Sequence, residues 1–302
     1  MPRFATKVDL QSLVCCIPGM QTYCSANHEE SNLNRIASFH PLPYFGAKEL
    51  RMIRVKRLFG KTALITGAGR GIGRATAIMF AEQRADLILI ARTALQLDET
   101  AALCKTINSD IRVLSVPTDL ADLRQIDRLF ELVDESGMTV DILINNAAVF
   151  ASGPSSEFPI DRFQHLLDIN LLAPYYLCQK AIPMMDKKRW GTIVNVSSLS
   201  GCFGVTKFPG FGAYNISKYG LWGLTEILAL ENKEHSIRVN QISLSGVDTQ
   251  MFVEASPPGV KAGLTPEQVA GEILYLASDE SAPVTGGNLI LDGNSRRWQS
   301  DD

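Results

Sequence analysis

The sequence has no apolar run long enough to cross a membrane and no surplus of positive charge. The longest smooth apolar stretches of the 302-residue chain, such as the one from Ala85 to Ala91, have the length of a strand. The formal net charge is -3, so no basic surface for nucleic acid is expected. With 46% hydrophobic and 20% charged residues, the composition is typical of a soluble globular protein. We therefore expect one large domain without a nucleic-acid or membrane partner.

Cysteine is scarce and shows no pairing pattern. The six cysteines form no C-x-x-C pair and have no histidine at metal-ligand spacing, so no metal site is expected. Reduced thiols used as small apolar residues point to a reducing compartment. We expect a cytoplasmic protein. The cysteines are Cys15, Cys16, Cys24, Cys104, Cys178 and Cys202.

The first 55 residues lack the periodic pattern of the rest of the chain. Three explanations stay open: an organelle transit peptide, a disordered regulatory tail, or an upstream start with Met52 as the working initiator. Asp9, Glu29 and Glu30 disfavour the transit peptide, because such peptides are poor in acids. We expect a poorly ordered N-terminal extension over residues 1–55, a Rossmann-like domain over 56–295 and a polar C-terminal tail over 296–302.

From Lys61 onward, apolar strand-like runs alternate with helix-like segments. Continuous runs of Val, Ile and Leu separated by helices predict a parallel sheet covered on both faces. The fold class is therefore α/β, a single doubly wound, Rossmann-like domain. The strand candidates are KTALITG, DLILIAR, IRVLSVPTDL, VDILINNAA, GTIVNVSS, IRVNQIS and GGNLILDGN.

A glycine-rich turn, TGAGRGIG at Thr66 to Gly73, directly follows the first strand candidate. A strand, a glycine turn and a helix in this order place free backbone N–H groups and the positive helix end where a pyrophosphate binds. The glycines let the phosphate approach the backbone. The spacing is not G-x-G-x-x-G, because Ile72 stands where the last glycine would fall.

The spacing T-G-x-x-x-G-x-G instead resembles that of the short-chain dehydrogenase/reductase family, including its 3-oxoacyl-[acyl-carrier-protein] reductases. Further family motifs follow in family order over roughly Gly60 to Gly293. One such motif alone is weak, but the ordered set is specific. The motifs are NNAA at Asn145–Ala148, Asp119 after the third strand, Asn170 in DINLLAPYYL, Ser198 at the end of IVNVSS, and Tyr214 and Lys218 in YNISK.

The resemblance implies a catalytic set of Tyr214, Lys218, Ser198 and Asn170. Tyr214 and Lys218 are four residues apart, so they share one face of a predicted helix. An ammonium near the phenol is expected to lower the phenol pKa and make Tyr214 a better proton donor. Ser198 would hydrogen-bond the substrate carbonyl oxygen. By resemblance, Asn170 would hold a water that links Lys218 to solvent.

Two arginines predict the cofactor NADP(H). The second strand ends at Ala91, where an NAD site carries a carboxylate for the ribose hydroxyl, and Arg92 follows at once. A guanidinium suits a 2'-phosphate, and Arg70 in the glycine turn adds a second positive charge. With Tyr214 and Lys218, the residues expected to bind the cofactor are Thr66, Gly67, Gly69, Arg70, Gly71, Ile72, Gly73, Arg92, Asp119, Leu120, Asn146, Ala147, Val247 and Thr249.

The sequence departs from the family pattern after the strand IRVNQIS. Leu244 and Ser245 stand where the family usually has Pro-Gly, while Val247 and Thr249 are retained. Gly246 is expected to restore the turn one position later. The departure puts the placement of the nicotinamide in doubt, and with it the rate.

The segments that border the substrate are expected to be apolar. The stretch from Ser198 to Tyr214 is about three residues longer than is common in the family, and it carries Phe203, Phe208 and Phe211. These phenylalanines favour an apolar substrate face, or a subunit contact. Residues Gly246–Thr265 have the Pro, Gly and small residues of a mobile lid.

These features predict an NADP-dependent oxidoreductase that acts on the CH-OH group of a carbonyl or secondary alcohol substrate, such as an apolar ketone or a 3-oxoacyl compound. The alternative is a non-catalytic NADP(H)-binding scaffold or redox sensor. Sugar-nucleotide chemistry would need a larger C-terminal region. The family implies a homotetramer or homodimer, and aromatic residues in YYLCQ and YGLWGL suit that interface.

Overall fold

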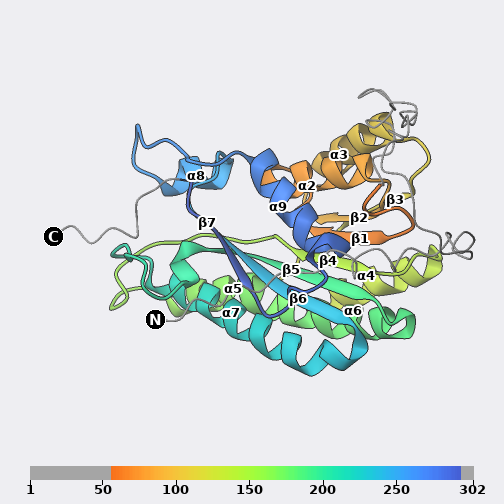
Figure 1. The fold of residues 1–302 in the computed structure, drawn as a ribbon. Helices are drawn as coiled ribbons and strands as arrows, with labels where there is room; N and C mark the ends of the chain where they lie inside the picture. The colour runs from red at the N-terminus through yellow and green to blue at the C-terminus, as the bar shows by residue number, and fades with distance from the viewer. Residues whose placement is uncertain (1–55, 294–302) are drawn as a thin grey trace, which may run out of the picture. The chain divides into compact units, whose positions relative to one another are not determined.

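The computed structural model describes residues 56–293, which form one compact unit around a seven-stranded parallel sheet (Figure 1). The strand order is β3-β2-β1-β4-β5-β6-β7, so the direction of winding reverses between β1 and β4. This is the doubly wound, Rossmann-like fold that the alternating pattern predicted. The strands are β1 (Thr62–Thr66), β2 (Asp86–Ala91), β3 (Val113–Pro117), β4 (Ile142–Asn145), β5 (Gly191–Ser198), β6 (Ile237–Leu244) and β7 (Asn288–Leu291).

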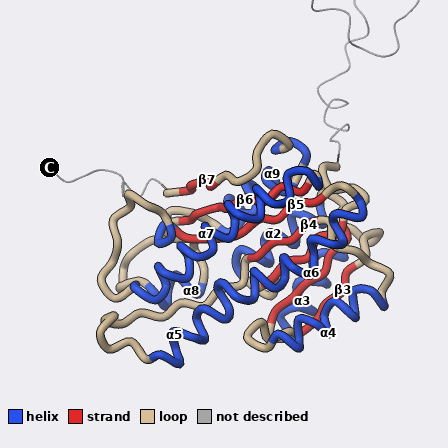
Figure 2. Tube along the Cα trace, turned by 90° about the horizontal axis from the view of Figure 1, so that it is seen from below, coloured by secondary structure: helices blue, strands red, loops and turns tan. Residues whose placement is uncertain are grey.

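Helices cover both faces of the sheet, as Figures 1 and 2 show. One face carries α2 (Gly71–Glu82), α3 (Ala94–Ile107) and α9 (Pro266–Ala277). The other carries α4 (Leu123–Glu135), α6 (Ala173–Lys188) and α7 (Gly212–Asn232), with α5 (Ile160–Leu167) against α7. The short helix α8 (Gln250–Ala255) follows β6.

Alternating residues of the central strands pack into two separate hydrophobic cores, one on each face of the sheet. On β1, Ile65 packs with the α2, α3 and α9 side, whereas its neighbour Leu64 packs with the α4, α6 and α7 side. Successive side chains of a strand point to opposite faces. Since both faces are buried, most strand positions carry apolar residues, which explains the near-continuous apolar runs in the sequence.

The predicted strands and helices are confirmed within these bounds. The segment Gly246–Thr265, predicted as a lid rich in loop residues, contains helix α8, and its two ends are joined by a bridge between Val247 and Leu264. Among the residues that the structure describes, no helix is long and apolar enough to cross a membrane. The predicted N-terminal extension and C-terminal tail lie outside the described residues.

A buried carboxylate ties β1 to β4 and α6. Asp141, which is 1% exposed, accepts a hydrogen bond from the Thr62 backbone N–H at 2.9 Å. Its second oxygen accepts one from the Lys188 ammonium at 2.6 Å. The pair of strands that flank the reversal point is thereby fixed at its amino end.

We expect Asp141→Ala to lower the free energy of unfolding by about 2 kcal/mol, because it leaves a buried backbone N–H without its charged acceptor. Urea denaturation measures the change. Asp98→Ala, which removes an exposed carboxylate from α3, is the control. Equal midpoints for the two variants would contradict a structural role for Asp141.

Candidate active site

A large cavity lies at the carboxyl ends of six strands. Its volume is about 1170 Å³, and its lining comes from the segments that follow β1, β2, β3, β4, β5 and β6. In open α/β sheets, ligands bind in the crevice outside the carboxyl ends of the strands, where the strand order reverses. The position of the cavity therefore matches a ligand site of this fold.

At the β1 end of the cavity, the glycine turn is packed too closely for side chains. A Cβ atom at Gly73 would lie 2.2 Å from the Gly67 carbonyl oxygen, and one at Gly69 would lie 2.9 Å from Gln96. Gly67 and Gly71 also have positive φ angles of 66° and 54°. Glycine is therefore required by contact at some positions and by backbone conformation at others.

Helix α2 begins at Gly71 directly after this turn, and no side chain caps its N-terminus. The N–H groups of a first helical turn have no partner inside the helix and attract anions. The turn, its close backbone approach and the uncapped helix start together fit the pyrophosphate of a dinucleotide. The resident residues thus suit the group that the sequence predicted.

Thr66 and Asn146 hold the turn against the end of β4. The Thr66 hydroxyl accepts hydrogen bonds from the backbone N–H groups of Asn146 and Ala147, both at 2.9 Å. The Asn146 amide donates to the Thr66 carbonyl at 2.7 Å. Thr66 and Gly73 do not line the cavity themselves, so their role is to support the residues that do.

The other predicted cofactor residues mostly reach the cavity. Its lining includes Arg70, Arg92, Asp119 and Leu120, with both arginines exposed. The Arg70 guanidinium donates a hydrogen bond to the side chain of Gln250, which joins the glycine turn to the start of α8. The lining also contains Gly67, Gly69, Gly71, Ile72, Asn146, Ala147, Val247 and Thr249.

Three of the four predicted catalytic residues meet in the cavity. Ser198 is the last residue of β5, and Tyr214 and Lys218 lie one helical turn apart near the start of α7. Tyr214 is 8% exposed and Lys218 is 2% exposed. The Lys218 ammonium donates to the Val196 carbonyl at 3.2 Å.

The structure corrects the predicted effect of Lys218 on the Tyr214 phenol. Burial raises the pKa of Tyr214 to about 12, although the hydrogen bond to Ser198 lowers it. Burial also lowers the pKa of Lys218 to about 8. The Lys218 ammonium lies 5.7 Å from the centroid of the Tyr214 ring, so desolvation outweighs the attraction that the spacing of four residues led us to expect.

Asn170 lies behind the cavity wall rather than in it. It sits in a single π-helical turn, Asp168–Leu172, that precedes α6. Its side chain makes two hydrogen bonds to the backbone of Val149, at 2.9 and 3.0 Å, and donates to the Ser217 hydroxyl at 3.1 Å. In this arrangement Asn170 fixes the wall residue Val149 next to α7.

The Leu244-Ser245 departure preserves the strand. Leu244 ends β6, and the Ser245 N–H donates to the Leu291 carbonyl of β7 at 2.9 Å. At Gly246 a Cβ atom would lie 2.3 Å from the Phe252 ring. Contact therefore requires glycine at this position, one residue later than in the family pattern. The buried Ser245 hydroxyl has no hydrogen-bond partner among the described residues.

A row of aromatic rings forms one wall of the cavity. Phe208 lies 5.4 Å from Phe211, Phe211 lies 4.8 Å from Phe150, and Phe150 lies 5.2 Å from Tyr214, all between ring centroids. Phe203 does not join them: it is 77% exposed and packs on Tyr219 instead. Sequence reasoning missed Phe150, whose only signal is its place just after the NNAA motif.

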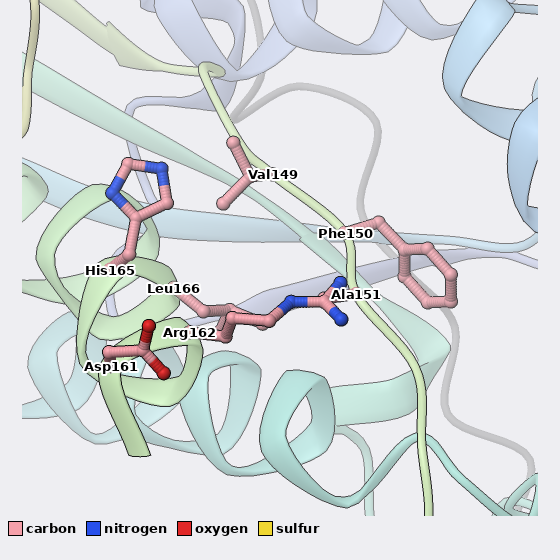
Figure 3. Close-up of a pocket in the computed structure, with 7 residues that line it drawn as sticks. All are labelled: Val149, Phe150, Ala151, Asp161, Arg162, His165 and Leu166. Carbon is pink, nitrogen blue, oxygen red and sulfur yellow. The ribbon is translucent and has the colours of Figure 1, made fainter. Parts of the chain in front are cut away.

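A smaller pocket of about 430 Å³ lies beside the same wall (Figure 3). Asp161, Arg162 and His165 of α5 face the extended segment of Val149 to Ala151. The three polar side chains are exposed. No group of His, Cys, Asp and Glu side chains that could hold a metal ion occurs within residues 56–293.

Comparison with known proteins agrees with this geometry. The short chain dehydrogenase family matches residues 61–258, so the chain belongs to the short-chain dehydrogenase/reductase family. It is similar to the 3-oxoacyl-[acyl-carrier-protein] reductase of Thermotoga maritima, with 34% identity over 78% of this chain and 98% of that one. Like its family, the chain is an oxidoreductase built for alcohol and ketone substrates and a nicotinamide cofactor.

Two solved structures share the fold. The carveol dehydrogenase of Mycobacterium avium, in complex with NAD, is 28% identical, with a TM-score of 0.72 over 80% of this chain and 99% of that one. A 7α-hydroxysteroid dehydrogenase, in complex with NADH and 7-oxo glycochenodeoxycholic acid, is 25% identical, with a TM-score of 0.74 over 80% and 96%.

The buried Lys218 should make stability depend on pH. Its pKa is about 8 in the folded protein, whereas an unperturbed lysine, as in the unfolded chain, titrates at 10.5. Below pH 8 both states hold the proton and the burial penalty is fully present. Between these values the unfolded chain binds more protons, so stability rises with pH. The raised pKa of Tyr214 has the opposite effect only above pH 10.

We therefore expect the free energy of unfolding of the wild type, relative to Lys218→Met, to rise between pH 7.5 and 9.5 by on the order of 1 kcal/mol. Urea denaturation at several pH values measures it. Lys105→Met, which removes an exposed lysine of α3, is the control for the loss of one lysine. A constant difference between wild type and Lys218→Met over this range would show that Lys218 is not desolvated.

Proposed function

We propose that the protein is an NADP(H)-dependent carbonyl reductase or secondary alcohol dehydrogenase with an apolar substrate. The observation that carries the proposal is one continuous cavity with the glycine turn at one end and Ser198, Tyr214 and Lys218 at the other. A dinucleotide held by the turn and a substrate held by the two hydroxyls would share this cavity.

The cofactor would be held by groups already in place. The N–H groups at the start of α2 and the glycine turn would take the pyrophosphate. Asp119 and Leu120, after β3, would border the adenine by resemblance to the family. Val247 and Thr249, which follow β6, also line the cavity. Thr249 lies against the glycine turn, since a Cβ atom at Gly71 would lie 3.2 Å from the Thr249 methyl group. When bound, the nicotinamide supplies or accepts the hydride.

Ser198 and Tyr214 would manage the charge that forms on the substrate oxygen. The Ser198 hydroxyl donates a hydrogen bond to that oxygen, and the Tyr214 phenol donates the proton that turns the alkoxide into an alcohol. An alkoxide is a stronger base than a phenolate, so a phenol with a raised pKa is still able to protonate it. The nearby Lys218 ammonium stabilises the phenolate that remains.

Arg92 and Arg70 support NADP(H) over NAD(H). Both arginines line the cavity, and Arg92 directly follows the end of β2, where a 2'-phosphate of the adenosine ribose would lie. The Arg70 guanidinium is bonded to Gln250 and adds a second positive charge to the cavity lining. Ala91, which ends β2, offers no carboxylate for a ribose hydroxyl. The alternative cofactor is NAD(H), which is bound in the carveol dehydrogenase and in the 7α-hydroxysteroid dehydrogenase.

The substrate end of the cavity is apolar. It is formed by the aromatic row with Met251, Phe252 and Val260 from the segment after β6. Of the charged lining residues, Arg70, Arg92 and Asp119 belong to the cofactor end. Lys218 is buried near the Tyr214 ring, and Asp248 lies between Val247 and Thr249. An apolar ketone, or the corresponding secondary alcohol, therefore fits better than a highly anionic substrate. A 3-oxoacyl substrate is the alternative, because the chain is similar to a 3-oxoacyl-[acyl-carrier-protein] reductase.

An oligomer is also proposed. Apolar side chains are exposed along α6 and α7 on the part of the surface that the structure describes: Tyr175 is 50%, Ile216 is 55%, Ile227 is 46% and Leu230 is 62% exposed. These two helices are the interface of homodimers and homotetramers by resemblance to the family. Size-exclusion chromatography with light scattering would measure the state.

A second candidate function is a non-catalytic NADP(H)-binding scaffold or redox sensor. One observation favours it: the buried Tyr214 phenol is a weaker proton donor than the sequence predicted, with its pKa raised to about 12. A titration with both cofactors and an assay with a panel of ketones separate this function from the enzyme.

We expect Arg92→Ala to weaken NADPH binding about tenfold or more and to leave NADH binding within about twofold, because only NADPH carries the 2'-phosphate. A fluorescence titration of wild type and variant with both cofactors measures the affinities and needs no substrate. Arg128→Ala on α4, whose guanidinium pairs with Glu131 and Glu135, is the matched control. Equal losses for NADPH and NADH would remove Arg92 from cofactor selection.

We expect Tyr214→Phe to reduce kcat for ketone reduction by about a hundredfold or more, because the variant lacks the proton donor. The dissociation constant for NADPH should stay within about twofold. The control is Tyr176→Phe, which removes a hydroxyl of α6 that donates to Asp127 of α4, away from the cavity. Retained turnover in Tyr214→Phe would show that another group is the acid.

A further inference from the structure

We propose that Lys207 is a positioning residue of the substrate end of the cavity. Its ammonium binds the backbone carbonyls of the turn that follows Ser198 and so stabilises the shape of that turn. The turn sets the direction of the Ser198 hydroxyl and the position of the aromatic row. This inference rests on the proposed function, because it concerns the substrate end of the same cavity. Lys207 itself does not line the cavity, so it acts through the residues that do.

The Lys207 ammonium donates to three backbone carbonyls of one short turn. The acceptors are Leu199 and Ser200, both at 3.0 Å, and Cys202 at 2.5 Å. An ammonium has three N–H donors and no acceptor, so its hydrogen-bonding capacity is filled by these carbonyls. Three converging carbonyl oxygens repel one another unless a cation lies between them. The turn therefore needs this charge to keep its shape.

The charge of Lys207 has no carboxylate partner within ion-pair distance among the described residues. Its other contact is the ring of Tyr219 on α7, with 5.0 Å from the ammonium to the ring centroid. The Tyr219 hydroxyl donates to the Cys202 carbonyl at 3.0 Å, the same oxygen that Lys207 reaches. Lys207 thus fixes the turn to the helix that carries Tyr214 and Lys218.

The turn that Lys207 holds also orients Ser198. The Ser200 N–H donates to the Ser198 hydroxyl oxygen at 3.1 Å, which leaves the hydroxyl proton for another acceptor. The turn has little room to shift, since a Cβ atom at Gly201 would lie 2.6 Å from the Lys218 carbonyl oxygen. A turn without its cation would move the Ser200 N–H and change the direction of the Ser198 hydroxyl.

The residues that directly follow Lys207 form part of the aromatic row. Phe208 and Phe211 line the cavity, and the Phe211 N–H donates to the Phe208 carbonyl in a tight turn at 3.2 Å. Phe211 then precedes the first residue of α7. Since the lysine is anchored at one end of this segment and α7 at the other, the two rings are held between fixed points.

The test compares Lys207→Met with Lys105→Met. Lys105 also donates to two backbone carbonyls, those of Ser109 and Ile111, but it lies between α3 and β3, away from the cavity. Both variants remove an ammonium that caps carbonyls, and only one of them touches the turn after Ser198. For each we would measure the NADPH dissociation constant, kcat and KM with 4-tert-butylcyclohexanone, and hydrogen–deuterium exchange of residues 199–211.

In Lys207→Met we expect kcat to fall by about tenfold to a hundredfold, as for a hydroxyl displaced by about 1 Å, with KM raised less. The NADPH dissociation constant should stay within about twofold, and exchange should increase over residues 199–211. Lys105→Met should leave kcat, KM and this exchange unchanged. Similar kinetics for the two variants, or unchanged exchange in Lys207→Met, would overturn the proposal.

Lys207→Arg keeps the test decisive if Lys207→Met loses NADPH binding. A planar guanidinium keeps the charge and the contact with Tyr219 but does not place three donors on one atom. We expect an intermediate fall in kcat with intact NADPH binding, and wild-type kinetics would overturn the proposal. If the wild type reduces no ketone, the proposed function fails, whereas the exchange measurement still tests whether Lys207 holds the turn.

Discussion

The site depends on the close approach of two backbones where β1 and β4 end. Their strands lie side by side because the winding of the sheet reverses between them. Glycine at position 73 lets α2 start against the Gly67 carbonyl, and Thr66 and Asn146 lock the two loops together. The first turn of α2 thereby opens into the same cavity that holds Ser198 and Tyr214. A Cβ atom at Gly67 would lie 2.8 Å from the Asn146 amide nitrogen and 3.1 Å from the Ala147 Cα, so only glycine allows this approach.

The same burial that shapes the site works against its charges. Lys218 and Tyr214 are buried, so the lysine loses its proton more easily than in water and the phenol keeps its proton more firmly. Folding therefore holds the pair in a state that costs stability. Groups with shifted pKa values are common at functional sites, because catalytic acids and bases need pKa values that differ from their values in water.

Sequence reasoning succeeded where the signal was local or periodic, and it failed where several segments meet. The glycine turn and the Tyr214-Lys218 spacing were read from neighbouring residues, and the structure places them as expected. Phe203 was predicted to lie at the substrate face or in a subunit contact, and it packs on Tyr219 outside the cavity lining. Phe150 was overlooked, although it links the aromatic row to Tyr214. Which aromatic side chain faces the cavity depends on the path of a loop. Hydrophobic periodicity predicts helices and strands but not the path of a loop.

The sequence by itself determined the α/β class, the parallel sheet, the dinucleotide turn and the family, because these follow from apolar periodicity and fixed short spacings. The tertiary structure alone decided the sign of the pKa change at Tyr214, the position of Asn170 behind the wall and the three carbonyls around Lys207. Desolvation and convergent hydrogen bonds depend on which distant segments enclose a group, and the order of residues along the chain does not specify that enclosure.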